Sequence, residues 1–188
     1  MTILQLFSII NHGKPRKRVK KMSVCFIGHR TIDITEELEK SLKETVESLI
    51  KKGVTTFFFG SKSQFNDLSW EIVTDLKGKY PYIKRVYIRS AYQYISKLYE
   101  DYLHGFYEET YFPPKIEKAG RYAHVERNYE MIDNSKYCVF YYNEKYQPHI
   151  SRHYKNSNRA STSCNSGTRI AYEYAVKKNK KVINLYEN

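Results

Sequence analysis

The sequence predicts an α/β fold with a doubly wound, mainly parallel β-sheet in a single domain. Strand-like and helix-like segments alternate along most of the chain, and a helix is the usual connection between parallel strands. Residues 54–59 form a continuous run of β-branched and aromatic residues, as expected of a strand that is covered on both faces. At 188 residues, the chain is long enough for one domain with a proper core.

Three strands and two helices are expected in the first half of the chain. The strands lie at residues 24–27, 54–59 and 83–88. Between them, apolar residues recur at helical spacing in two segments. Asp33 or Thr35 can cap the first helix, and Gly53 ends it. Gly78 and Pro81 close the second helix, so this half of the chain predicts a βαβαβ unit.

The second half of the chain is less regular. Residues 92–112 are rich in tyrosine and contain one expected helix. The tyrosine rings suit half-buried surface positions, although some could stack on a base or sugar. A helix at 122–132 and a strand at 137–142 follow, and the last elements are a turn, a helix and a short strand within 165–185. The polar segment 143–163 predicts a mobile loop, either a lid over a site or an insertion without a role.

Half of the excess positive charge lies in the N-terminal segment. The formal net charge is +12. Residues 1–22 carry six Lys or Arg and no acidic residue, whereas the remainder carries 26 basic and 20 acidic residues. We therefore expect a basic, disordered extension at 1–22 and one domain at 23–188, although Met22 could equally be the true start. The extension could bind nucleic acid or an acidic membrane surface, but an extension without a partner is the simpler interpretation.

The cysteines and the hydropathy indicate a soluble, cytoplasmic protein. Cys25, Cys138 and Cys164 lie far apart without a CxxC spacing, which favours reduced thiols and argues against a zinc site. No apolar run approaches the length of a membrane span, so no membrane partner is expected. No pattern in the sequence predicts a metal or another cofactor. A homo-oligomer is left open.

Two turns carry the chemistry that a ligand would need. Ser166, Gly167 and Thr168 open a helix, and the backbone N–H groups at a helix start suit a phosphate, although a plain helix cap explains the same residues. His29 and Arg30 directly follow the first strand. Because ligands of open parallel sheets lie outside the carboxyl ends of the strands, both turns could face one crevice. We expect Arg30, Arg127 and the Ser166–Thr168 turn to share one phosphate position.

The order of five motifs resembles the SLOG superfamily, and within it the uncharacterised YspA-like branch. The motifs are Phe26-Ile-Gly-His-Arg30, Phe58-Phe-Gly60 with Asp67 nearby, Leu76-Lys-x-Lys-Tyr-Pro-x-Ile-Lys84, Arg127-Asn-x-x-Met131-Ile-Asp133 and Ser166-Gly-Thr168. The resemblance covers roughly residues 23–185 and implies a Rossmann-like fold. The superfamily includes nucleotide-ligand sensors, DNA-processing proteins of the Smf type, and the LOG phosphoribohydrolases that cleave a base from a nucleoside monophosphate.

Two departures from the LOG pattern argue against glycosidic cleavage. LOG enzymes carry a Met-His-x-Arg-Lys motif, to which the segment around Arg127 is similar, but Asn128 stands in place of the lysine. Their second motif, Pro-Gly-Gly-x-Gly-Thr-x-x-Glu, ends on the catalytic glutamate, and this position is Ala171. Glu173 lies about 200° further round the helix. Without a carboxylate at this position, no group stabilises a developing oxocarbenium ion or activates water.

The residues and the resemblance together define two sets of candidates. The candidate ligand-binding or phosphate-binding residues are Gly28, His29, Arg30, Gly60, Ser61, Arg127, Asn128, Asn165, Ser166, Gly167 and Thr168. The candidate catalytic residues are His29, Asp67, Glu71 and Arg127.

Several candidates also have a purely structural explanation. Gly28 and Gly60 can simply end strands. His29 could be a general acid or base, but a lone histidine is more often a hydrogen-bonded structural residue. Asp67 and Glu71 are four residues apart on one helix face and could hold a ribose or a metal, while a helix cap and a solvated face explain them equally well.

The function predicted from the sequence is binding of a nucleotide or a nucleotide-derived ligand, as a sensor or binding module. The alternative is a nucleotide-processing enzyme: a LOG-like phosphoribohydrolase, a nucleosidase or a deoxyribosyl transferase that uses His29, Asp67 or Glu71 in place of the missing glutamate. The second alternative is a protein that interacts with DNA through the basic extension.

Overall fold

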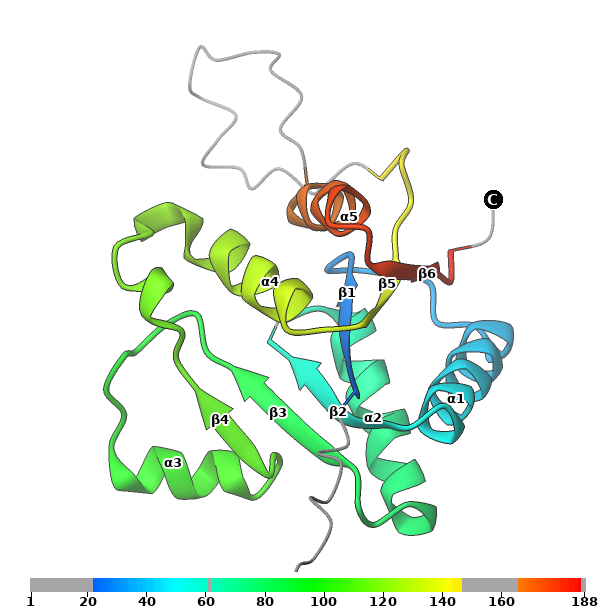
Figure 1. Cartoon of the computed structure of the whole chain (residues 1–188), viewed down its shortest axis with the longest axis horizontal. Helices are drawn as coiled ribbons and strands as arrows, with labels where there is room; N and C mark the ends of the chain where they lie inside the picture. Colours follow the sequence, from blue (N-terminus) through cyan, green and yellow to red (C-terminus); the bar gives the residue numbers. More distant parts are fainter. Residues whose placement is uncertain (1–21, 61, 147–165, 187–188) are drawn as a thin grey trace, which may run out of the picture.

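Six parallel strands form one sheet in a computed structural model that describes residues 22–60, 62–146 and 166–186. The strands are β1 (Met22–Gly28), β2 (Val54–Phe59), β3 (Lys84–Ile88), β4 (Glu109–Tyr111), β5 (Tyr137–Tyr141) and β6 (Lys181–Asn184). Their order in the sheet is β4-β3-β2-β1-β5-β6, and every neighbouring pair is parallel (Figure 1). The predicted α/β fold with a doubly wound, Rossmann-like sheet is confirmed.

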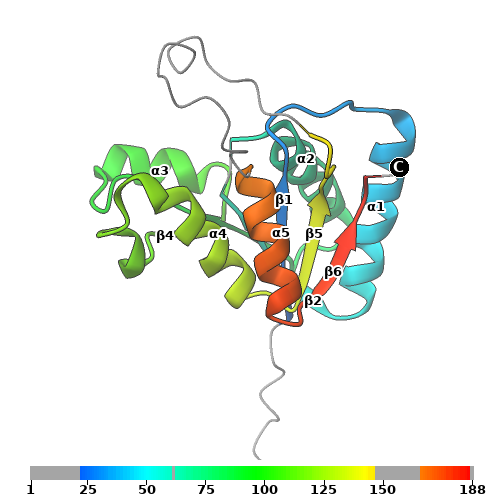
Figure 2. The same ribbon diagram turned by 90° about the horizontal axis from the view of Figure 1, so that it is seen from above.

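Helices cover both faces of this sheet. They are α1 (Glu36–Lys51), α2 (Gln64–Lys79), α3 (Lys97–His104), α4 (Ala123–Asp133) and α5 (Gly167–Lys177). The first three lie on one face, and α4 and α5 lie side by side on the other (Figures 1 and 2). Strands β2, β3 and β4 are added on one side of β1, and β5 and β6 are added on its other side. Because the connections are right-handed, the connecting helices move from one face of the sheet to the other at this point. The switch point between β1 and β5 is where such sheets bind ligands.

The helix starts follow the predicted capping chemistry. Of the two candidate caps of α1, Thr35 is the one used, and its hydroxyl accepts a hydrogen bond from the backbone N–H of Leu38 at 3.2 Å. Gly53 follows α1 with a φ of 91°, a left-handed conformation that favours glycine. The predicted stop at Gly78 is wrong, because α2 continues through this residue to Lys79. A single glycine lowers helix propensity without breaking the helix.

The core consists of two apolar layers, one on each face of the sheet. Because side chains alternate along a strand, Phe26 of β1 packs under α1 and α2, whereas Ile27 packs under α4 and α5. Cys25 and Cys138 are register partners on β1 and β5, and both are buried free thiols. The sequence alone did not reveal that these two cysteines are neighbours. Cys164 lies outside the described residues.

The region between β3 and α4 contains the expected helix and one strand that was not predicted. The tyrosine-rich segment contains a short helix, α3, whose cap is the hydroxyl of Ser96. It is followed by β4, a strand of three residues that was not predicted and that pairs with the edge of β3. Two 3₁₀ turns, Pro114–Ile116 and Gly120–Tyr122, then lead into α4.

The predicted N-terminal boundary shifts by one residue. Met22 is the first residue of β1 and pairs with Val54, so it belongs to the sheet. Residues 1–21, which make up the rest of the predicted extension, lie outside the described residues. The same holds for residues 147–163 of the predicted loop or lid. In the described part of the chain, no helix has the length and apolar character needed to cross a membrane.

Candidate functional site

The carboxyl edge of the sheet brings together most of the predicted site residues. Since all strands run in the same direction, the residues after β1 and β2 meet the N-terminal ends of α2, α4 and α5 at this edge. His29 and Arg30 follow β1, Gly60 follows β2, and Arg127 lies on α4. Ser61 and Asn165 lie outside the described residues.

Arg127 is the most buried charged group at this edge, with 4% of its surface exposed. Its Nη1 donates to the carbonyl oxygen of Gly60 and, at 3.5 Å, to the hydroxyl of Ser90. Its Nε and Nη2 donate to Oδ1 of the neighbouring Asn128 at 3.3 and 3.0 Å. The guanidinium is therefore held by neutral acceptors only, and Asn128 supports the arginine.

The charge of Arg127 has no acidic partner in the described part of the chain. Burial lowers the pKa of Arg127 to about 10, and the interaction with Tyr87 opposes this shift in part. The guanidinium still carries its charge at neutral pH. A buried cation without a counterion is costly, and a bound anion would remove this cost.

Gly60 is needed because the arginine passes directly over it. A Cβ atom at this position would lie 2.6 Å from Cδ and 2.9 Å from Nε of Arg127. The backbone N–H of Gly60 donates to Oδ1 of the buried Asn66 at 3.3 Å, which fixes the turn between β2 and α2. Gly60 thus does more than end a strand, because it makes room for the buried guanidinium.

Three positively charged side chains, those of Arg30, Lys62 and Arg127, act electrostatically on His124, and we call these four residues the basic cluster. Burial lowers the pKa of His124, and the positive charges of Arg127, Arg30 and Lys62 lower it further. Nδ1 of His124 lies 2.9 Å from the hydroxyl of Ser90, which also receives the long hydrogen bond from Arg127. Arg30, Lys62 and His124 are exposed, whereas Arg127 is buried.

Sequence reasoning missed Lys62, Ser90 and His124 as site residues. They come from three separate segments, each unremarkable by itself. One signal was present, because His124 precedes Arg127 by three residues on α4 and so lies on the same face of the helix.

His29 is buried and engaged with the loop after β5. It is 1% exposed, and its ring stacks on Tyr146 with the ring centres 3.8 Å apart. Its Nε2 lies 2.9 Å from the backbone N and 3.2 Å from the carbonyl O of Asn143, so the tautomer of the ring decides whether Nε2 accepts from this N–H or donates to this carbonyl. Nδ1 is buried and has no hydrogen-bond partner among the described residues.

The environment of His29 disfavours acid or base catalysis at neutral pH. Burial lowers its pKa to about 4, and the backbone hydrogen bond with Asn143 opposes this shift only in part. The imidazolium form that a general acid needs is then scarce. A general base works best with a pKa near the operating pH, and the pKa of His29 lies well below neutral pH.

Gly28 has a packing explanation. A Cβ atom on this residue would lie 2.6 Å from Cβ, Cγ and Cδ1 of Phe65 on α2. The absence of a side chain lets the end of β1 approach the first turn of α2. Arg30 is tied to the same turn, since its carbonyl oxygen accepts from the N–H of Gln64 at 3.0 Å.

The turn at the start of α5 behaves as a helix cap. The hydroxyl of Ser166 accepts from the N–H of Arg169 at 3.1 Å, and Thr168 is buried. Ala171 is 1% exposed and packs in the apolar layer beneath α4 and α5. Glu173 is exposed and pairs with Arg169 at 2.8 Å.

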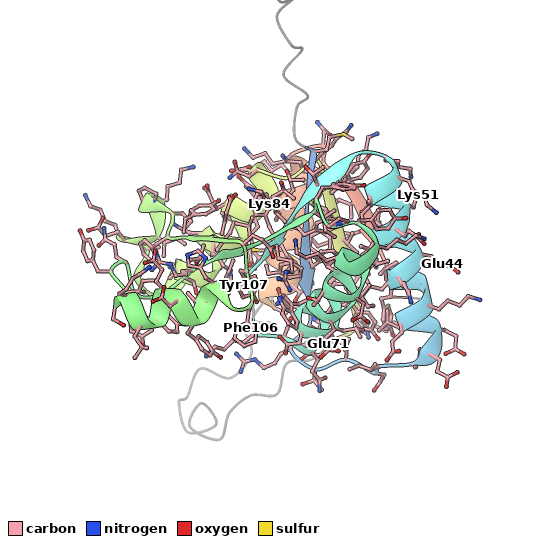
Figure 3. The ribbon with its side chains drawn as sticks, turned by 90° about the horizontal axis from the view of Figure 1, so that it is seen from below. Glu44, Lys51, Glu71, Lys84, Phe106 and Tyr107 are labelled. Carbon is pink, nitrogen blue, oxygen red and sulfur yellow. The ribbon has the colours of Figure 1, made fainter. Side chains whose placement is uncertain are left out.

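Asp67 and Glu71 lie on the exposed side of α2. Both are exposed, and Glu71 is visible on the face of the molecule that α1, α2 and α3 cover, beside Phe106 and Tyr107 (Figure 3). Burial raises the pKa of Asp67, and its charge acts on the hydroxyl of Tyr107. Arg127 lies on α4, on the opposite side of the sheet, so the structure does not group Glu71 with the basic cluster.

A pocket of about 790 Å³ opens beside this edge, beyond β5 and β6. It is lined by Tyr142, Asn143, Glu144, Lys145, Arg169, Tyr172, Glu173, Asn184 and Tyr186. The acidic and basic side chains that line it are equal in number, and Arg169 is already paired with Glu173. The pocket adjoins His29 through Asn143 but contains no member of the basic cluster.

The described residues contain no group of three or more His, Cys, Asp or Glu side chains that could hold a metal ion. Neither the protein-family models nor the curated proteins compared with this chain give a match. The case for a function therefore depends on the site itself.

Proposed function

We propose that the protein binds a nucleotide or a nucleotide-derived ligand at the carboxyl edge of its sheet, with a phosphate group in the basic cluster. The observation that carries this proposal is the buried guanidinium of Arg127, which has no carboxylate partner among the described residues. Phosphate suits it because arginine and lysine side chains are the usual partners of phosphate oxygens.

The position in the fold supports the same ligand class. Rossmann-like sheets bind nucleotides outside the carboxyl ends of their strands, near the switch point, and the basic cluster lies at this edge. The resemblance of the motifs to the SLOG superfamily agrees with a nucleotide ligand. Arg127 and Gly60 come from two of these motifs, and they are in direct contact.

The site favours a binding module over a hydrolase. At the position of the LOG glutamate, Ala171 belongs to an apolar layer, and burial keeps His29 neutral at neutral pH. Without a catalytic carboxylate, the basic cluster binds the ground state and the transition state of a ligand about equally, which gives affinity without rate acceleration.

A thermal-shift panel of nucleosides and nucleoside monophosphates tests the proposal. We expect at least one monophosphate to raise the melting temperature, since a ligand at a hundred times its Kd stabilises by about 2.7 kcal/mol. Arg127→Met should abolish this shift and should itself fold, because replacing a buried charge by an apolar side chain of similar length is often tolerated.

The matched control is Arg121→Met, which removes an exposed arginine just before α4. This variant should respond to nucleotides as the wild type does. Unchanged phosphate-dependent binding in Arg127→Met, or no response of the wild type to any nucleotide, would show that the proposal is wrong.

A further inference from the structure

The pocket beyond β5 and β6 is a second place at the carboxyl edge of the sheet where a ligand can be held. Its volume of about 790 Å³ is in the range of small-molecule sites. Its lining residues come from α5, from the end of β6, and from the segments that follow β5 and β6 (Figures 1 and 2). The chemistry of these residues differs from that of the basic cluster.

Tyrosine rings form the apolar part of the pocket. Tyr142 and Tyr172 stack with their ring centres 4.5 Å apart, and Tyr186 packs edge-on against Tyr141 with the ring centres 5.3 Å apart. Tyr142, Tyr172 and Tyr186 are half-buried and line the pocket, so part of each side chain remains accessible. Because aromatic rings prefer offset-stacked or edge-to-face partners, these tyrosines favour a flat aromatic ligand.

Hydrogen bonds fix the pocket without using the hydroxyl groups of these tyrosines. The side-chain amide of Asn184 accepts from the backbone N–H of Tyr142 at 2.9 Å and donates to its carbonyl oxygen at 3.0 Å. Oδ1 of Asn143 accepts from the backbone N–H of Lys145 at 2.8 Å. No hydrogen bond joins the hydroxyl groups of the lining tyrosines to another residue in the described part of the chain. Each hydroxyl group can therefore still donate to a ligand or accept from it.

The charges in the pocket disfavour a phosphate and suit an uncharged ligand. Glu144 and Glu173 balance Lys145 and Arg169, so a phosphate would meet two carboxylates here. A nucleotide base is planar and uncharged, and its edge needs both hydrogen-bond donors and acceptors. The pocket and the buried charge of Arg127 thus match the two chemically different ends of a nucleotide.

One nucleotide can bridge the distance between the two sites. Arg127 is fixed at the end of β2 by its hydrogen bond to the carbonyl oxygen of Gly60, and the pocket begins directly after β5. In the order β2-β1-β5, these strand ends are two strand spacings apart, roughly 10 Å. His29 follows the strand between them, and its Nε2 lies 2.9 Å from the backbone N of the pocket residue Asn143. A sugar can therefore connect a phosphate at Arg127 with a base in the pocket.

We infer that this pocket binds the base of the nucleotide, which stacks on the tyrosine rings and forms hydrogen bonds with their hydroxyl groups. This inference rests on the proposed nucleotide binding and gives the second half of the ligand a position. The affinity for an unphosphorylated nucleoside then depends on the tyrosines, and the affinity that a phosphate adds depends on Arg127.

Calorimetric titration with adenosine, guanosine, cytidine and uridine, with their monophosphates, and with inorganic phosphate separates the two sites. Tyr172→Leu and Tyr186→Leu each remove one ring and one hydroxyl group from the pocket. We expect each variant to bind nucleosides and monophosphates about 10- to 100-fold more weakly, which is the usual effect of losing one base–aromatic contact. Its affinity for inorganic phosphate should not change. In Arg127→Met, by contrast, a monophosphate should bind no more tightly than its nucleoside.

Tyr94→Leu is the matched control, because this tyrosine precedes α3 and is 87% exposed. It should keep all wild-type affinities. Circular dichroism checks that each variant is folded, and Tyr186→Leu decides the result if Tyr172→Leu, within α5, does not fold.

Each outcome bears on one proposal or on both. Wild-type nucleotide affinity in the folded tyrosine variants would overturn the base-site inference and leave nucleotide binding intact. Tyrosine-dependent binding of nucleosides, to which a phosphate adds no affinity, would support the base site and refute the phosphate site. If neither nucleosides nor monophosphates bind to the wild type, both proposals are wrong.

Discussion

The side chain of Arg127 crosses the backbone of Gly60 at a distance that leaves no space for a methyl group. Nη1 donates to the carbonyl oxygen of Gly60, and a Cβ atom there would lie 2.6 Å from Cδ of the arginine. The glycine at the end of β2 and the arginine on α4 thus form one unit, although they are 67 residues apart in the sequence. Substitution of the glycine therefore tests the seating of the arginine without removing its charge.

Gly60→Ala should displace the guanidinium and weaken phosphate-dependent ligand binding while Arg127 remains. We expect a loss of about 1–3 kcal/mol in the free energy of unfolding, because overpacking shifts neighbouring groups. Chemical denaturation and ligand titration measure the two effects.

Gly78→Ala is the control, since a Cβ there meets nothing within 4 Å. In the helical α2 this change should stabilise by up to about 1 kcal/mol. Wild-type ligand affinity in Gly60→Ala would mean that the seating of Arg127 is irrelevant to binding.

Gly28→Ala should destabilise the protein through packing alone. The added Cβ would lie 2.6 Å from Cβ of Phe65, an atom close to the backbone of α2 that cannot move away as a flexible side-chain end could. We expect a loss of about 1–3 kcal/mol in unfolding experiments. In protein that remains folded, ligand affinity should be unchanged within experimental error. A selective loss of affinity with unchanged stability would instead assign Gly28 to the ligand site.

His29 should make the protein less stable in acid. Its pKa is lowered from 6.5 to about 4 by burial, so the unfolded chain binds a proton more readily than the folded protein does between these values. Stability is then complete above about pH 6.5 and falls as the pH drops towards 4, by at most about 3 kcal/mol. Below pH 4 both states are protonated and the effect of this residue levels off.

His29→Gln can isolate this contribution. Glutamine keeps an acceptor for the N–H of Asn143 but does not titrate, so the loss of unfolding free energy between pH 7 and pH 4.5 should be smaller than in the wild type. Urea denaturation at the two pH values measures the difference. His104→Gln, at the exposed end of α3, should keep the wild-type difference. If His29→Gln loses as much unfolding free energy between pH 7 and pH 4.5 as the wild type does, then His29 does not cause this loss.

The main elements of the fold were predictable because each leaves a local signal. Val54–Phe59 consists of β-branched and aromatic residues throughout, which fits a strand covered on both faces, and its bounds match the expected strand. Thr35 was one of two plausible caps, and the geometry of the turn decides between it and Asp33. β4 was missed because three residues, none of them fully buried, are too few to form a pattern.

The candidate site was predictable only in part. Arg127 and Gly60 stand in recognisable motifs, but their contact depends on how α4 lies across the end of β2. Lys62, Ser90 and His124 were not predicted, because surface lysines, serines and histidines are common and only the tertiary fold brings these three together. The orientation of His29, with Nε2 held by the loop after β5, likewise depends on the pairing of β1 with β5.

Ala171→Glu decides between a binding module and a silenced hydrolase. The side chain of Ala171 is 1% exposed and belongs to the apolar layer that also contains Cys25 and Ile27, so a glutamate there would place a carboxylate in an apolar layer. We expect a loss of about 3–5 kcal/mol in the free energy of unfolding and no gain of catalysis. Val176→Glu, on the exposed side of the same helix with 51% exposure, should be tolerated.

Activity is the decisive readout, because stability alone would not exclude a hydrolase. The wild type should release no appreciable free base from nucleoside monophosphates that it binds, since no carboxylate stands where the LOG enzymes place theirs. Chromatography of the free base after prolonged incubation measures this release. If Ala171→Glu folds and cleaves nucleotides, the helix can turn this position towards the ligand and the remaining site is hydrolase-like. If the wild type cleaves them at ordinary enzymatic rates and loses this activity in Asp67→Asn, the protein is an enzyme and the binding-module proposal is wrong.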